Sequence, residues 1–153
     1  MNIEELRDLV CEEFPDLCPL FSIEFGDGVL QVGCERVHRA AQDLRSIGFD
    51  RLGMVTAVDR LEHFEMVYRL QSRAVSAGMF LKCELPHENP ETDSLVDVYP
   101  AALWQEREVY DLFGVVFRGH PDLKRILLPP EFEGHPLRKD YDDDRVVKRP
   151  DYI

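Results

Sequence analysis

Apolar side chains recur with two different periods along the first ninety residues of the chain. Residues 3–14 carry them at helical spacing up to Pro15, and residues 37–47 carry a second helical stripe that stops at Gly48. Shorter runs with the period of a strand fill the remaining intervals: Leu20–Phe25, Val29–Gly33, Leu52–Val58, His63–Leu70 and Met79–Leu85. The pattern therefore predicts a helix, two strands, a helix and three strands, in that order.

The strand patterns indicate an antiparallel sheet with one buried face. Gly26 and Gly28 separate the first two runs and predict a hairpin. In residues 63–70, Phe64 and Met66 alternate with polar neighbours, so one side of that strand faces the core. Short connections favour antiparallel pairing of the last three strands. We expect a two-layer α+β domain with its helices on one face of the sheet.

A polar, proline-bearing stretch, residues 86–93, separates this scaffold from a short helix predicted over Ala101–Phe113 and ended by Gly114. Beyond Pro129 the chain is rich in proline, glycine and charge, with too few apolar residues for a core of its own. We expect three parts: an α+β scaffold over 1–90, a helical segment packed on it over 91–128, and an extended arm over 129–153 that is ordered only on a partner protein.

Charged residues crowd the predicted 101–113 helix. Arg107 and Asp111 share a face, whereas Glu106 and Glu108 point in opposite directions and cannot form a paired-carboxylate site. Ion pairing with Arg107 and capping of nearby backbone are favoured over acid–base catalysis for these carboxylates.

Two rigid turns follow with the same order of residues. Gly119-His-Pro is followed by Lys124 and Arg125, and Gly134-His-Pro by Arg138 and Lys139. The proline stiffens each turn and the glycine permits close approach. A basic pair on a stiff turn suits docking to another protein, and the histidines His120 and His135 are expected to be structural.

The net charge of −12 restricts the possible partners. All of the excess acid lies in residues 1–117, whereas residues 118–153 hold eight basic and eight acidic side chains. Such a surface repels phosphate backbones, so nucleic-acid binding is not expected. The four aspartates that follow Arg138 and Lys139 closely also oppose binding of a lipid head group. No apolar run approaches the roughly 20 residues that cross a bilayer, and no signal or transit peptide is expected.

The four cysteines match no metal pattern. Cys11, Cys18, Cys34 and Cys83 have spacings that fit neither zinc nor iron–sulfur sites. We expect free thiols in a reducing cytoplasm, with Cys11 and Cys83 in the core.

The segment from Trp104 to Leu127 resembles the signature of the thirty-kilodalton (C-type) subunit of respiratory complex I. The resemblance rests on Glu106-Arg107-Glu108, Asp111-Leu112-Phe113, His120, Lys124 and Ile126-Leu127, and flanking residues 94–141 agree with it. It implies a structural subunit of the peripheral arm of a proton-translocating NADH:quinone oxidoreductase, at the cytoplasmic face of the membrane. It also implies that this chain binds no cofactor, and that flavin, iron–sulfur clusters and quinone lie in neighbouring subunits.

The partner implied by the resemblance is the forty-nine-kilodalton (D-type) subunit, which is similar to the large subunit of nickel–iron hydrogenases. No residue is expected to be catalytic, to bind a cofactor or to bind a metal. The residues expected at the partner interface are Trp104, Glu106, Arg107, Glu108, Asp111, Phe113, His120, Lys124, Arg125, His135, Arg138, Lys139 and Tyr141.

Two alternatives remain open from the sequence. The chain could be the equivalent subunit of an energy-converting hydrogenase, or of a quinone-reducing relative fed by ferredoxin or a deazaflavin. An alternative of another class is a stand-alone metal-dependent enzyme that uses Glu108, Asp111, His120 and His135. The first is distinguished by the proteins that copurify, and the second by stoichiometric metal binding to the isolated chain.

Overall fold

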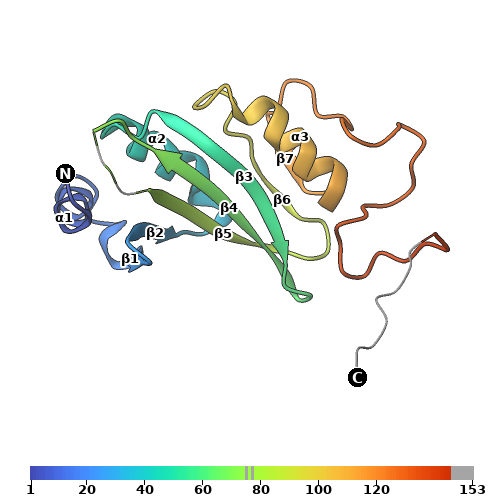
Figure 1. Ribbon diagram of the computed structural model, residues 1–153, viewed down its shortest axis with the longest axis horizontal. Helices are drawn as coiled ribbons and strands as arrows, with labels where there is room; N and C mark the ends of the chain where they lie inside the picture. The colour runs from blue at the N-terminus through green and yellow to red at the C-terminus, as the bar shows by residue number, and fades with distance from the viewer. Residues whose placement is uncertain (75, 77, 146–153) are drawn as a thin grey trace.

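A computed structural model describes residues 1–74, 76 and 78–145 and confirms the predicted helices and strands with small shifts at their ends (Figure 1). The helices are α1 (Ile3–Glu13), α2 (Val37–Ser46) and α3 (Ala102–Phe113), with short 3-10 turns η1 (Cys18–Leu20) and η2 (Cys34–Arg36). The strands are β1 (Phe21–Glu24), β2 (Asp27–Gln31), β3 (Arg51–Asp59), β4 (His63–Gln71), β5 (Met79–Pro86), β6 (Glu91–Asp93) and β7 (Val116–Arg118). In the described part of the chain, no helix combines the length and the apolar character that crossing a bilayer requires.

The main sheet has the strand order β1-β2-β5-β4-β3. Its last three strands in sequence pair antiparallel, as the short connections predict. The sequence did not anticipate that β2 pairs parallel to β5, with Leu30 opposite Leu81, nor that β6 and β7 form a separate two-stranded parallel sheet. Both pairings join segments that are far apart in the chain, so no local pattern encodes them.

The three helices bury their apolar stripes against one face of the sheet, which confirms the two-layer α+β prediction. One continuous buried cluster joins them to the sheet, and α1 contributes Leu6 to it, α2 contributes Leu44 and α3 contributes Phe113. Figure 1 shows α2 behind the strands and α3 beside β3. The N–H of Val55 on the edge strand β3 donates to the side chain of Gln105 on α3 at 2.6 Å, so the helix also satisfies this sheet edge.

The tip of the β1–β2 hairpin is formed by Phe25 and Gly26 rather than by the span between the two glycines. Both have positive φ, 53° and 87°, and the Phe25 side chain is fully exposed. A left-handed conformation costs a bulky residue about 1 kcal/mol or more relative to glycine or asparagine. This turn therefore carries both conformational strain and exposed apolar surface.

The cysteine prediction is wrong for one pair. Cys11 at the end of α1 and Cys18 in η1 are joined by a disulfide, and their Cα atoms are 4.5 Å apart. The chain reverses at Pro15 between them, a proximity that spacing alone does not reveal. Cys34 and Cys83 are free, and burial raises the pKa of the Cys83 thiol to about 12, as fits a core residue. Cys11 is only partly buried, so its assignment to the core is also corrected.

Candidate functional site

Helix α3 buries the carboxylate of Glu106 completely. The Ser94 hydroxyl donates to its Oε2 at 2.6 Å, and the Leu95 N–H donates to its Oε1 at 2.7 Å. Burial raises the pKa of Glu106 to about 7, and these two hydrogen bonds only partly oppose that effect. Glu106 therefore fixes the loop after β6 to the helix. Glu108, two residues on, is exposed, as the helical geometry predicts.

Asp111 is equally buried but has a stronger set of donors. The N–H groups of Ile126, Leu127 and Leu128 donate to its Oδ2 at 3.0, 2.7 and 2.9 Å, and Arg125 donates to its Oδ1 at 2.8 Å. Burial acts to raise the pKa of Asp111, but these hydrogen bonds outweigh it and hold the pKa below its ordinary value. The expected backbone capping is confirmed. The expected ion pair with Arg107 is wrong, because the partner is Arg125 from a distant loop.

The second Gly-His-Pro turn caps the C-terminus of α3. His135 Nδ1 bonds the carbonyl of Asp111 at 2.9 Å, the Leu137 N–H bonds that of Leu112 at 3.0 Å, and Arg138 Nε bonds that of Phe113 at 2.6 Å. The last carbonyls of a helix have no partners within the helix, and a cation there also complements the helix dipole.

Gly114 makes this cap possible. Its φ is +76°, and a Cβ at this position would lie 2.6 Å from His135 Cδ2 and 2.9 Å from Arg138 Nη2. The glycine thus serves both to end the helix and to admit the turn that covers it.

The first Gly-His-Pro turn is held against the other end of the helix. His120 Nε2 bonds the carbonyl of Leu103 at 2.9 Å. Arg107, which stacks on Trp104 at 5.1 Å, donates to the carbonyls of Lys124 and Arg125, both at 3.0 Å. Both histidines are therefore structural, as expected.

Asp59, at the end of β3, connects this strand to two distant positions of the chain, His87 and Lys139. The sequence reasoning missed it. It accepts hydrogen bonds from the N–H of Leu61 at 2.7 Å, the N–H of Lys139 at 2.9 Å and His87 Nε2 at 3.2 Å. Burial acts to raise the pKa of Asp59, but these donors lower it below the ordinary value. His87 also stacks on Phe64 with ring centroids 4.6 Å apart. A single aspartate at the end of a strand gives no sequence signal that it will hold distant segments together through hydrogen bonds.

These contacts correct the prediction for the arm. Residues 129–145 contain no helix or strand, but residues 134–139 are bound to the chain's own helix and to Asp59. That part of the arm is thus ordered on its own domain rather than only on a partner. Residues 146–153 of the predicted arm lie outside the described residues.

The residues of the alternative metal enzyme are not brought together. Asp111 already accepts four hydrogen bonds at its carboxylate, His120 bonds Leu103 and Asp122, and His135 bonds the Asp111 carbonyl. Among the described residues, Asp59, His87 and Asp140 come close enough to share a metal ion. Both carboxylate oxygens of Asp59, however, already accept hydrogen bonds from the donors described above.

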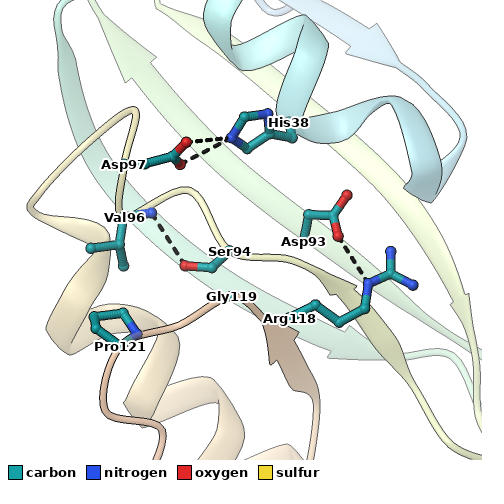
Figure 2. Close-up of a pocket in the computed structure, with 8 residues that line it drawn as sticks. All are labelled: His38, Asp93, Ser94, Val96, Asp97, Arg118, Gly119 and Pro121. Carbon is teal, nitrogen blue, oxygen red and sulfur yellow. Dashed lines mark hydrogen bonds and ion pairs between the residues drawn. The ribbon is translucent and has the colours of Figure 1, made fainter.

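A cavity of about 540 Å³ lies where β6, β7 and α2 meet (Figure 2). A polar pair lies on each side of it: His38 is hydrogen-bonded to Asp97 at 2.8 Å, and Arg118 forms an ion pair with Asp93 at 2.9 Å. Ser94, the hydroxyl that holds Glu106, lines the cavity as well. The polar side chains His38, Asp97, Asp93 and Arg118 that line it are thus paired with one another at short distances.

The structure divides the thirteen predicted interface residues by burial. Glu106, Arg107, Asp111 and Phe113 are buried in the chain's own interior and contribute little or nothing to its exposed surface. Trp104, Glu108, Lys124 and Lys139 are exposed, whereas His120, Arg125, His135, Arg138 and Tyr141 are partly exposed. The sequence reasoning missed two exposed leucines, Leu127 and Leu137. Both lie in residues 119–139, the segment that wraps α3 through the contacts described above and is called the wrapping segment below.

Comparisons with known proteins agree with the signature. Residues 30–146 match the family model described as the respiratory-chain NADH dehydrogenase 30 Kd subunit. The chain is 44% identical over 146 residues to the C-type NADH-quinone oxidoreductase subunit of Moorella thermoacetica, covering 91% of this chain and 92% of that protein. It is 38% identical over 148 residues to the same subunit of Salinispora tropica, covering 90% of this chain but only 60% of the length of that relative.

Two solved structures share the fold. A trypsin-resistant fragment of Nqo5 superimposes with a TM-score of 0.65 and 29% identity, covering 80% of this chain and all of that one. A chain of the membrane-bound sulfane sulfur reductase, an archaeal respiratory membrane complex, has a TM-score of 0.79 and 25% identity over 98% of both chains. This chain belongs to the 30 kDa subunit family of the respiratory-chain NADH dehydrogenase, the C-type subunits of NADH-quinone oxidoreductase.

Proposed function

We propose that this chain is a structural subunit of the peripheral arm of a proton-translocating NADH:quinone oxidoreductase, held at the cytoplasmic face of the membrane. It docks on the hydrogenase-like large (D-type) subunit through α3 and the segment that wraps it. It holds no cofactor and no catalytic residue, and flavin, iron–sulfur clusters and quinone belong to its neighbours. Family membership supports the role, because the relatives are named as subunits of that oxidoreductase.

One observation supports the docking surface: the signature carboxylates Glu106 and Asp111 act inside the chain, while large apolar side chains on α3 and on the segment that wraps it are exposed. Glu106 and Asp111 are fully buried, whereas Trp104, Leu127 and Leu137 expose 58%, 61% and 51% of their surface. Exposed apolar surface of this kind marks interaction sites, and tryptophan is common at the centre of an interface. The buried carboxylates thus give the rigidity with which α3 and its wrapping segment present these side chains.

Lys124 and Lys139 are exposed on the same segment, and Glu108 is exposed on the helix itself. The guanidinium of Arg107 lies 5.1 Å from the centre of the Trp104 ring, a contact that favours this orientation of the ring before any partner binds. An anchor that is already oriented loses less entropy on binding.

The test is assembly of the complex with Trp104→Ala combined with Leu137→Ala. We expect the subunit to be lost from the complex on a native gel, or its affinity for the large subunit to fall at least 30-fold. Both side chains are exposed, so the melting temperature of the isolated chain should change by less than about 2 °C.

Ile23→Ala is the matched control, because Ile23 is 42% exposed on β1, at the edge of the sheet opposite the edge strand β3 that α3 binds. It should leave assembly intact. Normal assembly of the Trp104/Leu137 variant would contradict the proposed docking surface. If the control variant also failed to assemble, the loss would reflect a general sensitivity to changes in exposed apolar residues. That result would also contradict the proposed docking surface.

A second candidate is the equivalent subunit of a related respiratory complex with another electron donor, such as an energy-converting hydrogenase or a ferredoxin- or deazaflavin-linked relative. The superposition on the sulfane sulfur reductase chain, over 98% of both chains, favours it. Purification of the native complex separates the two candidates. An NADH-oxidising flavoprotein among the copurifying subunits supports the first, and its absence supports the second.

A further inference from the structure

The face of the main sheet opposite the helices carries apolar residues that belong to no part of the main core. Val29 on β2 and Val67 on β4 expose only 4% and 8% of their surface, yet neither belongs to the continuous cluster beneath the helices. Phe80 on β5 lies between their strands, opposite Val29 in the parallel pair. In Figure 1, α2 lies on the far side of these strands.

These residues form the floor of a groove of about 410 Å³, here called the sheet groove. Its floor and walls are Val29, Val67, Phe80 and the exposed Phe25 at the hairpin tip, and its rim is Glu24, Asp27, Glu65 and Lys82. It opens away from α3, so it is a surface separate from the docking surface proposed above.

Phe25 gives the groove its strongest indication of a partner. It occupies a turn position where asparagine or glycine is preferred, with φ of +53°, and its ring is fully exposed. Neither the strain nor the exposed ring contributes to the stability of the chain. An aromatic side chain kept in this state beside an apolar groove fits a contact with another molecule.

The rim favours a cationic occupant. Three of its four charged side chains are carboxylates, and Lys82 already faces Glu24 at 3.7 Å. Next to the rim, Glu84 lies directly opposite Glu65 across β4 and β5, so that two like charges face each other there.

Two arginines at the margin reduce this charge without reversing it. Arg60 reaches Glu65 at 3.4 Å, and Arg69 stacks on Phe80 at 5.7 Å. The net charge of the whole chain is −12, so a second copy and a phosphate-rich surface are both repelled.

We propose that the sheet groove binds a segment of another protein that carries a large apolar side chain next to a lysine or arginine. The apolar side chain packs between Phe25 and Phe80 over the two valines, and the cation lies against the carboxylate rim. The subunit would then contact two partners through opposite sides, one at α3 and one at the sheet groove.

The experiment is photo-crosslinking in the intact purified complex with p-benzoylphenylalanine in place of Phe25. We expect a covalent adduct with another subunit, mapped to a peptide with lysine or arginine within about three residues of the attachment site. The same photo-crosslinker in place of Ile23, an exposed apolar residue of β1 that does not line the sheet groove, is the control and should give no such adduct.

The rim is tested separately with Glu24→Gln combined with Glu65→Gln, which should reduce the adduct from position 25 at least fivefold. Glu12→Gln combined with Glu13→Gln makes the same charge change on the exposed end of α1 and should leave the yield unchanged. An adduct with a second copy of this chain, with lipid or with a segment lacking basic residues would overturn the proposal. So would no adduct at position 25, or equal loss with both double variants.

Discussion

Glu106 and Asp111 lie on the same helix with no exposed surface, yet their surroundings shift their pKa values in opposite directions. Burial dominates at Glu106, where two donors are too few to offset desolvation, and its pKa rises to about 7. At Asp111 a guanidinium and three consecutive backbone N–H groups reverse the effect of burial. Perturbed carboxylates of this kind often mark catalytic sites. Here their donors come from segments that need a fixed position, so the two residues organise the loops around α3.

Glu106→Gln should change how stability depends on pH. The folded Glu106 keeps its proton to about pH 7, whereas the unfolded residue loses it near its ordinary value of 4.5. Stability from this group is therefore fully present below pH 4.5 and is lost as pH rises to about 7, by on the order of 3 kcal/mol. Urea unfolding of both proteins from pH 4.5 to 8 measures it. Groups common to both proteins cancel in the difference, so parallel curves would contradict the raised pKa.

At the scale of elements, α3 is a helix whose C-terminus is completed by a segment more than twenty residues further on. Three of its last four carbonyls accept from Leu137, Arg138 and His135, and the fourth, that of Tyr110, accepts from Gly114. A helix of twelve residues is marginal by itself in water. Its order in this fold therefore depends on the wrapping segment as well as on its buried stripe.

Gly114→Ala should destabilise the chain by about 3 kcal/mol. The change adds the cost of a left-handed alanine, about 1–2 kcal/mol, to displacement of the His135–Arg138 turn by the new Cβ. Gly119→Ala is a matched control, because Gly119 has φ of +80° but nothing within 4 Å of its Cβ position. It should cost only the conformational part. Equal losses in chemical denaturation would show that the cap contributes little.

At the scale of the whole molecule, a single buried cluster joins the 1–90 scaffold to the 91–128 segment. Phe64 of β4 meets Phe113 of α3 edge to face at 6.1 Å, and Arg138 from the arm lies over the same Phe64 ring at 5.1 Å. Asp59 adds a polar link between the scaffold and Lys139. The arm is thus attached to both other parts of the chain at one corner of the core.

Truncation after Leu128 should separate these contributions. We expect amide exchange in the last turn of α3 to accelerate at least tenfold, because its carbonyls lose their donors, while β4 and β5 stay protected. Truncation after Arg145 keeps every contact named here and serves as the control. Unchanged amide exchange in α3 after truncation at Leu128 would contradict a role for the arm in holding the helix.

Hydrophobic periodicity determined the three helices and the five strands of the main sheet, and the short connections determined the antiparallel pairing of the last three strands. Local rules also placed the helix end at Gly114, and the spacing of charged residues around Glu106 and Asp111 carried the family resemblance. Each of these depends on neighbours within a few residues, which a linear pattern records. The sequence reasoning failed where the decisive partner is distant, as with the parallel β2–β5 pair, or where a turn brings two side chains together, as with the Cys11–Cys18 disulfide.

The orientation of the charged residues was decided only by the tertiary structure. On the helix itself, Glu106 and Asp111 could face a partner as readily as the interior. They are buried because the fold brings the N–H group of Leu95 to one, and the guanidinium of Arg125 with the amides of residues 126–128 to the other. A carboxylate can leave water only where enough donors replace it, and those donors belong to segments that meet only after the chain has folded.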